Sequence, residues 1–132
     1  IVPMVGTANI RYLEVDQDHV TVRIENTRNM QNHIQGVHAA AMALLAETAT
    51  GFLTGLHVPD NRILLIKSLH VDYLKVAQGG LTATATLSAE QQSFIADNDK
   101  GELLIPVTVI DDAGNAPIQC QMLWAWLPKR KK

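Results

Sequence analysis

The segment from about Val37 to about Leu56 constrains the fold of this chain more than any other part of the sequence. It reads VHAAAMALLAETATGFLTGL, and its first half is apolar all round when drawn as a helix. A helix with this pattern is buried on most of its sides instead of lying on a surface. The remainder of the chain must therefore enclose this helix.

The segments on either side of the helix have the composition of β-strands. Before it, IRYLEV and HVTVRIEN flank the turn DQD, which predicts a hairpin or two early strands. After it, turn residues separate four segments that we predict to be strands: RILLIKSLHVDYLKV, GLTATATLS, ELLIPVTVID and APIQCQMLWAWL. Ser88, followed by Gln91 three residues later, predicts a short inserted helix between the second and third of these.

Strands that follow one another through short connections form an antiparallel sheet. We therefore expect an α+β fold in which an antiparallel sheet wraps around one long central helix. With 132 residues, 47% of them hydrophobic, the chain fits one domain, which we place at residues 1–132.

Composition also excludes several classes of partner. The net charge of −2 gives no electrostatic reason to bind nucleic acid. No apolar run approaches the roughly 20 residues that span a bilayer, and the start IVPMVGTANI lacks the regions of a signal peptide. Cys120 is the only cysteine, so no intrachain disulfide forms, and we read it as a small buried hydrophobe in a strand. We expect a soluble cytoplasmic protein.

Glu47 is the one ionisable group in the middle of the apolar helix. Such a position costs free energy unless the carboxylate is paired, neutralised or used. The structural explanation is an ion pair with Arg62, Lys67 or another base. The functional explanation gains weight from the preceding loop, which holds Asn32 and His38 in NHIQGVH.

Together, Asn32, Gly36, His38 and Glu47 resemble the active-site signature of hotdog-fold acyl-CoA thioesterases of the phenylacetate-degradation and 4-hydroxybenzoyl-CoA types. Those proteins carry an Asn, a Gly, a His-Gly-Gly at the helix start, and an Asp or Glu further along. The segments VDYLKVAQGG and VTVIDDAGNAPIQCQMLWAWL also resemble the family, most closely a branch described only as candidate thioesterases. The sequence departs from the pattern where Ala39 and Ala40 replace the two glycines, and where Glu replaces the Asp of many relatives.

The resemblance implies hydrolysis of acyl-CoA thioesters, and the chemistry fits these residues. Backbone N–H groups at Ala39 and Ala40, at the helix N-terminus, would stabilise the oxyanion. Glu47 would act as general base or as nucleophile, and the sequence leaves both open. Asn32 would orient the water or the thioester, and His38 would hold the helix start in shape. No cofactor is needed beyond the CoA of the substrate.

No metal site is expected, because the five histidines show neither His-x-His nor His-Glu-x-x-His spacing. Two polar residues on the strand after the helix, Ser68 and Asp72, are candidates to reach the pocket. Surface cations near the mouth are candidates to bind the adenosine phosphates of CoA. These are Arg28, Arg62, Lys67 and Lys75.

Two alternative functions remain open at this stage. The first is a non-catalytic acyl-CoA or fatty-acyl binding module, which the alanines at positions 39 and 40 favour. The second is a hydratase or dehydratase on the same fold, which ranks lower because the sequence lacks an HFPG-like histidine loop.

Helix geometry predicts that two chains share each site. His38 and Glu47 are nine residues apart in the sequence, which is roughly 13 Å along a helix and about half a turn around it. They cannot hold one thioester together within a single chain. We therefore expect a homodimer with antiparallel helices, alone or paired into a homotetramer, as the resemblance also implies.

Overall fold

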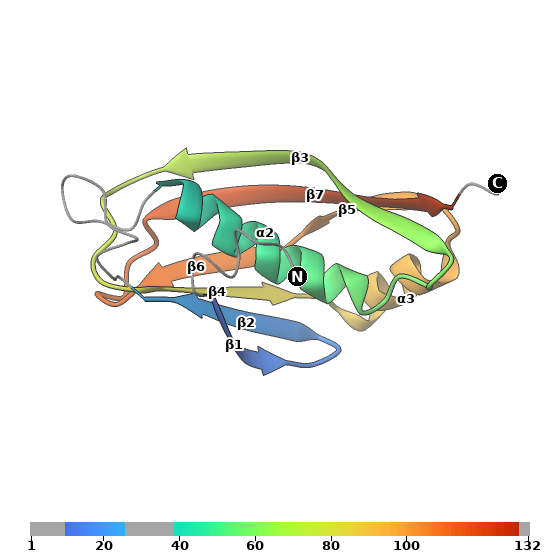
Figure 1. Ribbon diagram of the computed structural model, residues 1–132, viewed down its shortest axis with the longest axis horizontal. Helices are drawn as coiled ribbons and strands as arrows, with labels where there is room; N and C mark the ends of the chain where they lie inside the picture. Colours follow the sequence, from blue (N-terminus) through green and yellow to red (C-terminus); the bar gives the residue numbers. More distant parts are fainter. Residues whose placement is uncertain (1–9, 26–38, 130–132) are drawn as a thin grey trace.

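The computed structural model describes residues 10–25 and 39–129. Along the chain the elements are β1 (Arg11–Val15), β2 (His19–Ile24), α2 (Ala39–Gly55), β3 (Arg62–Tyr73), β4 (Leu81–Thr86), α3 (Ala89–Asp97), β5 (Gly101–Ile105), β6 (Val107–Asp111) and β7 (Ile118–Pro128). Every strand pairing is antiparallel. Helix α2 lies between β3 and β7 on one side and β2 and β4 on the other (Figure 1). The predicted hotdog fold is confirmed.

The strands form a sheet of four in the order β1-β2-β4-β6 and a sheet of three in the order β3-β7-β5. Pro106 separates β5, which pairs with β7, from β6, which pairs with β4. Proline has no N–H to donate to a ladder, so the chain changes sheets at this residue. The Pro106 carbonyl still accepts a hydrogen bond from the Thr86 N–H at 3.1 Å. The segment ELLIPVTVID is thus two strands, and our prediction of one was wrong.

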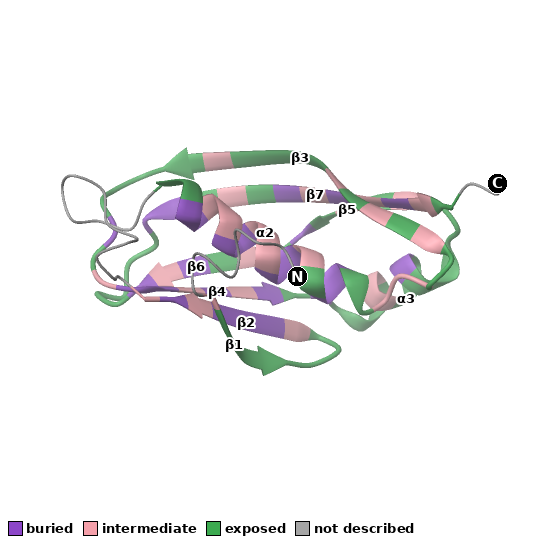
Figure 2. Ribbon diagram, in the orientation of Figure 1, coloured by how far each residue is buried: buried purple, intermediate pink, exposed green. Residues whose placement is uncertain are grey.

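The face of α2 that meets the sheets is buried, as the apolar pattern of the segment predicts. Its buried residues are Ala41, Met42, Leu45, Ala46, Ala49, Thr50, Leu53 and Thr54. The inward positions of β4 are Leu81, Ala83 and Ala85, all completely buried, and two of them are small enough to let the helix approach closely. Figure 2 shows buried residues along α2, β2 and β4.

Trp124 on β7 fixes the contact between this sheet and α2. Its indole Nε1 donates to Thr50 Oγ1 at 2.8 Å, and its ring lies against Gly51, where an added Cβ would be 2.6 Å from Cζ2. Thr50 in turn donates to the Ala46 carbonyl at 2.9 Å. A buried indole N–H needs such a partner, so the pair Thr50–Gly51 provides both the acceptor and the space.

The inserted helix α3 confirms the capping-box prediction. Ser88 Oγ accepts from the Gln91 N–H at 3.1 Å, and Gln91 Oε1 accepts from the Ser88 N–H at 2.8 Å. Phe94 on α3 meets Trp126 of β7 edge to face, with ring centroids 5.7 Å apart. Trp126 Nε1 donates to the Asn98 carbonyl at 2.8 Å. These contacts dock α3 at the opposite end of α2 from the helix start (Figure 1).

Candidate functional site

Glu47 lies in the middle of α2 and is half-buried. Its neighbours one turn away on the helix, Ala43 and Gly51, offer no charge to pair with it. Within residues 10–25 and 39–129 its carboxylate forms no ion pair. The two cations that we considered as partners are engaged elsewhere: Arg62 pairs with Asp99, and Lys67 Nζ lies 2.8 Å from Glu102 Oε1. The structural explanation for Glu47 therefore loses both of its named partners.

The start of α2 is held by the end of β3. The helix begins at Ala39, and the Tyr73 hydroxyl donates to the Ala39 carbonyl at 3.1 Å. Ala39 and Ala40 are both exposed, and the first turn of α2 contains no acidic side chain. The first turn of a helix carries the positive end of its dipole. The described part of this helix end thus has the electrostatic character that an oxyanion site requires.

The sequence interpretation missed Tyr73 as a contact of the helix start. The face of β3 on which Tyr73 lies is set by a β-bulge between Ile66 and Ser68, because a bulge changes the alternation of side chains after it. No residue pattern in the strand marks this bulge, so the sequence carried no clear signal.

Four of the predicted site residues lie outside the described residues. They are Arg28, Asn32, Gly36 and His38. Their assigned roles remain predictions from the resemblance.

Ser68 and Asp72 face away from α2 within one chain. Strand residues alternate between faces, and Tyr73 marks the helix-facing side of this part of β3 because it contacts Ala39. Ser68, His70 and Asp72 are therefore on the outer side. There His70 Nε2 lies 3.0 Å from Asp72 Oδ1, and both residues line a cavity of about 360 Å³.

Of the described cations predicted to bind phosphate, Lys75 is best placed. Arg62 and Lys67 are paired with carboxylates, whereas no ion pair among the described residues involves Lys75. Lys75 follows Tyr73 by two positions and is exposed. Its ammonium group is therefore available to an anion.

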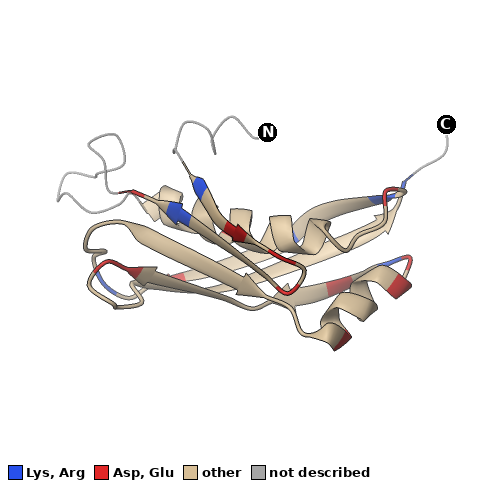
Figure 3. Cartoon of the chain, turned by 90° about the horizontal axis from the view of Figure 1, so that it is seen from below, with Lys and Arg blue, Asp and Glu red and all other residues tan. Residues whose placement is uncertain are grey.

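The other charged groups among the described residues are dispersed. Figure 3 shows Lys and Arg scattered among Asp and Glu over the described segments. One group of possible metal ligands, Asp16, Asp18 and His19, lies at the β1–β2 turn. The hydrogen bond between Asp18 and His19 lowers the pKa of the carboxyl and raises the pKa of the imidazole. His57 holds this turn near the end of α2, since its Nε2 lies 2.7 Å from the Gln17 carbonyl.

The antiparallel sheet around one central helix places the chain in the class of hotdog-fold proteins, and solved structures share this fold. Protein PA5026 of Pseudomonas aeruginosa superposes with a TM-score of 0.85 at 20% identity, over 97% of this chain and 89% of that one. A variant of the Staphylococcus aureus thioesterase SAV0944 superposes with a TM-score of 0.81 at 16% identity, over 96% of this chain and 100% of that one. Protein BH2602 of Bacillus halodurans, solved with CoA, superposes with a TM-score of 0.78 at 20% identity, over 98% of this chain and 82% of that one. At these identities the likeness shows the fold.

The chain belongs to the DUF4442 family, a domain of unknown function, whose sequence pattern matches residues 1–127. No curated protein matches the chain closely. No helix within the described residues is long and apolar enough to cross a membrane.

Proposed function

We propose that this protein hydrolyses acyl-CoA thioesters and that Glu47 is its catalytic carboxylate. The observation that carries the proposal is a half-buried carboxylate in an apolar helix, without an ion pair among the described residues. The same helix begins with Ala39 and Ala40, with no acidic side chain in its first turn. Support also comes from two proteins of the same fold, a thioesterase and a protein solved with CoA.

The proposed reaction uses two groups, the backbone N–H groups at the start of α2 and the carboxylate of Glu47. The helix-start N–H groups of Ala39 and Ala40 stabilise the negative charge that develops on the thioester oxygen. Glu47 accepts a proton from a water molecule as the oxygen of that water attacks the carbonyl carbon. The tetrahedral intermediate then expels the CoA thiolate, which takes up a proton and leaves a carboxylic acid behind. Direct attack by Glu47, giving an anhydride that water then cleaves, is the second form of this chemistry.

Each site is formed by two protomers in this proposal. Ala39 and Glu47 are eight residues apart in α2, or roughly 12 Å along the helix, which is too far for both to contact one thioester carbon. A second chain supplies the missing group. Each site would combine the helix start of one protomer with Glu47 of its partner. Three residues of the preceding loop would complete it in the roles that the resemblance gives them: Asn32, Gly36 and His38.

Strand β3 supports the two-chain arrangement. It is the outer strand of its sheet, and its apolar side chains Ile63, Leu65, Leu69 and Tyr73 are exposed. A long apolar edge strand is a surface for pairing with another strand. Antiparallel pairing of β3 with its copy around a two-fold axis would form the dimer, and two such dimers would form the homotetramer.

The first test is release of free thiol from a panel of acyl-CoAs, with Glu47→Gln as the main variant. Loss of the general base should lower kcat by about 100-fold or more. Glu90→Gln, the same change at an exposed position in α3, is the matched control and should retain full activity. Absence of thiol release from every acyl-CoA by the wild type would refute the proposal, as would an active Glu47→Gln enzyme.

The second test asks whether two chains share each site. Asn32→Ala and Glu47→Ala chains are inactive alone in this proposal. Mixed dimers contain one doubly altered site and one intact site, so random exchange should restore about a quarter of wild-type sites. Proven subunit exchange without recovered activity would show that each site is formed within one chain.

A non-catalytic acyl-CoA binding module is the second candidate function. It is favoured by the methyl groups of Ala39 and Ala40, which are exposed at the helix start, where the thioesterases that the signature resembles have glycines. Binding of acyl-CoA without thiol release would identify this function.

A further inference from the structure

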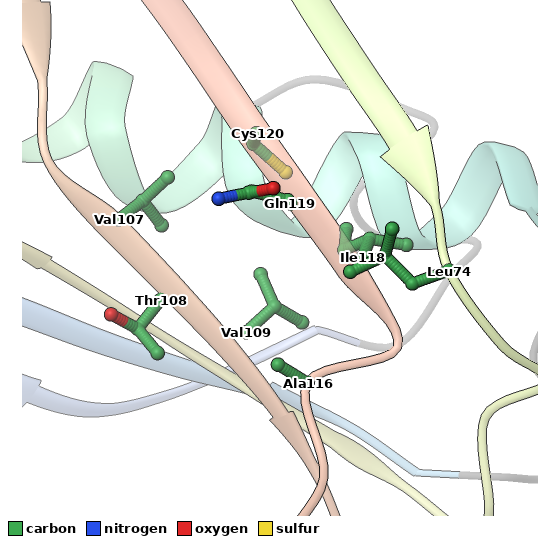
Figure 4. A pocket seen from close by; sticks show the side chains of 8 residues that line it. All are labelled: Leu74, Val107, Thr108, Val109, Ala116, Ile118, Gln119 and Cys120. Carbon is green, nitrogen blue, oxygen red and sulfur yellow. The ribbon is translucent and has the colours of Figure 1, made fainter.

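A cavity opens where β6 and β7 separate. Up to Ile105 the chain is paired with β7, but after Pro106 it is paired with β4. Nothing in the strand pairing of the described residues joins β6 to the first part of β7. The space between them has a volume of about 300 Å³, and we call it the β6–β7 cavity (Figure 4). Its lining residues are Leu74, Val107, Thr108, Val109, Ala116, Ile118, Gln119 and Cys120.

The lining of the β6–β7 cavity is uncharged and largely apolar. Val107 and Val109 in the lining come from β6, and Gln119 and Cys120 come from β7 (Figure 4). Burial raises the pKa of the Cys120 thiol to about 11, which reflects the apolar surroundings. An ionised group would lose its hydration here without gaining a counter-charge, whereas a neutral apolar group would gain free energy on entry.

The cavity lies beside the start of α2. Leu74 in its lining directly follows Tyr73, whose hydroxyl contacts the Ala39 carbonyl. Ile118, also in the lining, is the strand partner of Tyr73 in the β3–β7 ladder. A thioester held at the helix start is therefore close to the cavity.

The cavity also adjoins a polar space. Gln119 and Cys120 line both the β6–β7 cavity and the cavity of about 360 Å³ that contains His70 and Asp72. An apolar hollow and a polar hollow thus share these two residues of β7. This arrangement is typical of ligand sites, in which apolar walls bind the body of a molecule and a few polar groups orient it.

We infer that the β6–β7 cavity binds the acyl group of the thioester substrate. This inference rests on the proposed function and adds the class of acyl group. The volume is at the lower end of the roughly 300–1,000 Å³ found for ligand pockets. Uncharged acyl groups of short or medium length, or with one aromatic ring, fit the cavity, whereas long fatty chains and acyl groups that carry a free carboxylate do not.

The first experiment narrows the cavity and measures chain-length preference. Val107→Phe places a larger side chain in the lining. Val58→Phe is the matched control, because Val58 is also half-buried against the core but lies beyond the other end of α2. Each methylene excluded from an apolar site costs about fourfold. Val107→Phe should lower the ratio of kcat/KM for hexanoyl-CoA to that for acetyl-CoA by about tenfold or more, and Val58→Phe should leave this ratio unchanged.

The second experiment uses the wild-type protein, so it does not depend on the folding of a variant. Cys120 is the only cysteine of the chain, and its alkylation by iodoacetamide at about pH 9 can be followed by mass spectrometry. S-hexyl-CoA, which cannot be hydrolysed as a thioester, should slow alkylation at least about fivefold. S-methyl-CoA, which has no chain to fill the cavity, should not.

The outcomes separate the inference from the proposed function. If acyl-CoAs are hydrolysed but Val107→Phe and Val58→Phe have the same length preference, or both thioethers affect Cys120 equally, the cavity is not the acyl site and the hydrolase proposal stands. If no acyl-CoA is hydrolysed, the hydrolase proposal fails. In that case selective protection of Cys120 by S-hexyl-CoA would still support acyl binding in the cavity, and its absence would overturn it.

Discussion

Replacing Gly51 with alanine adds one methyl group between α2 and Trp124, and we expect this change to destabilise the protein. The new Cβ would lie 2.6 Å from Trp124 Cζ2 and 2.7 Å from Cη2, closer than the 3.0 Å that real Cβ contacts respect. The indole cannot turn away freely, because its Nε1 donates to Thr50 Oγ1 within the buried core. Either the helix moves away from the sheet or this hydrogen bond breaks.

The size of the effect follows from two opposing contributions. In a helix interior, alanine is favoured over glycine by about 1 kcal/mol. Overpacking a core costs about 1–3 kcal/mol, and a buried donor that loses its acceptor costs a similar amount. The two costs are alternatives, so only one of them, about 2 kcal/mol, applies. The net loss for Gly51→Ala is then about 1 kcal/mol, which for a domain of this size corresponds to a decrease in Tm of roughly 4 °C.

Gly55→Ala is the matched control on the same helix. A Cβ there would lie 3.6 Å from Leu64 Cδ2, an ordinary contact, so only the gain in helix propensity remains. Thermal unfolding followed by circular dichroism, at one protein concentration because association shifts Tm, should show Gly51→Ala below the wild type and Gly55→Ala equal to it or higher. An equal rise in Tm for both variants would refute the close packing of Trp124 on Gly51.

Two further predictions concern the helix start and the ion pairs. Tyr73→Phe removes only the hydroxyl that contacts the Ala39 carbonyl, and kcat should decrease by about fivefold to tenfold with little change in KM. Tyr12→Phe, the same change at the other tyrosine, should leave kcat unchanged. Equal kcat in both variants would contradict a positioning role for Tyr73. The hydrogen bond from Arg23 lowers the pKa of Asp112 below its usual value; this contribution to stability is present above about pH 4 and is lost as the pH falls through the lowered pKa. Tm should therefore decrease more steeply for the wild type than for Arg23→Gln as the pH falls below about pH 4, and parallel curves would contradict this.

The sequence predicted the parts of the fold that depend on local patterns. The apolar run of α2 required an enclosing sheet, and the spacing of Ser88 and Gln91 located α3. The break at Pro106 was also visible in principle, because proline is rare inside a central strand. We predicted one continuous strand across Pro106 because strong β-formers lie on both sides of it.

The candidate site was only partly predictable for a physical reason. Glu47 could be singled out because a charge in an apolar helix is unusual within the sequence itself. The orientation of Ser68 and Asp72 could not be predicted, because the bulge after Ile66 reverses the faces of β3 and depends on pairing with β7. The contact between Tyr73 and Ala39 joins residues 34 positions apart, and no local pattern encodes such a distance.

The two tryptophans give the protein a pair of intrinsic fluorophores that report on different parts of it. Trp124 contacts α2 through Thr50, and Trp126 contacts α3 through Phe94 and the segment after it. Replacing each in turn with phenylalanine leaves a single emitter at one of the two helices. Emission from Trp126 that shifts at lower denaturant concentration than emission from Trp124 would show that the inserted helix detaches before the central helix is exposed to water.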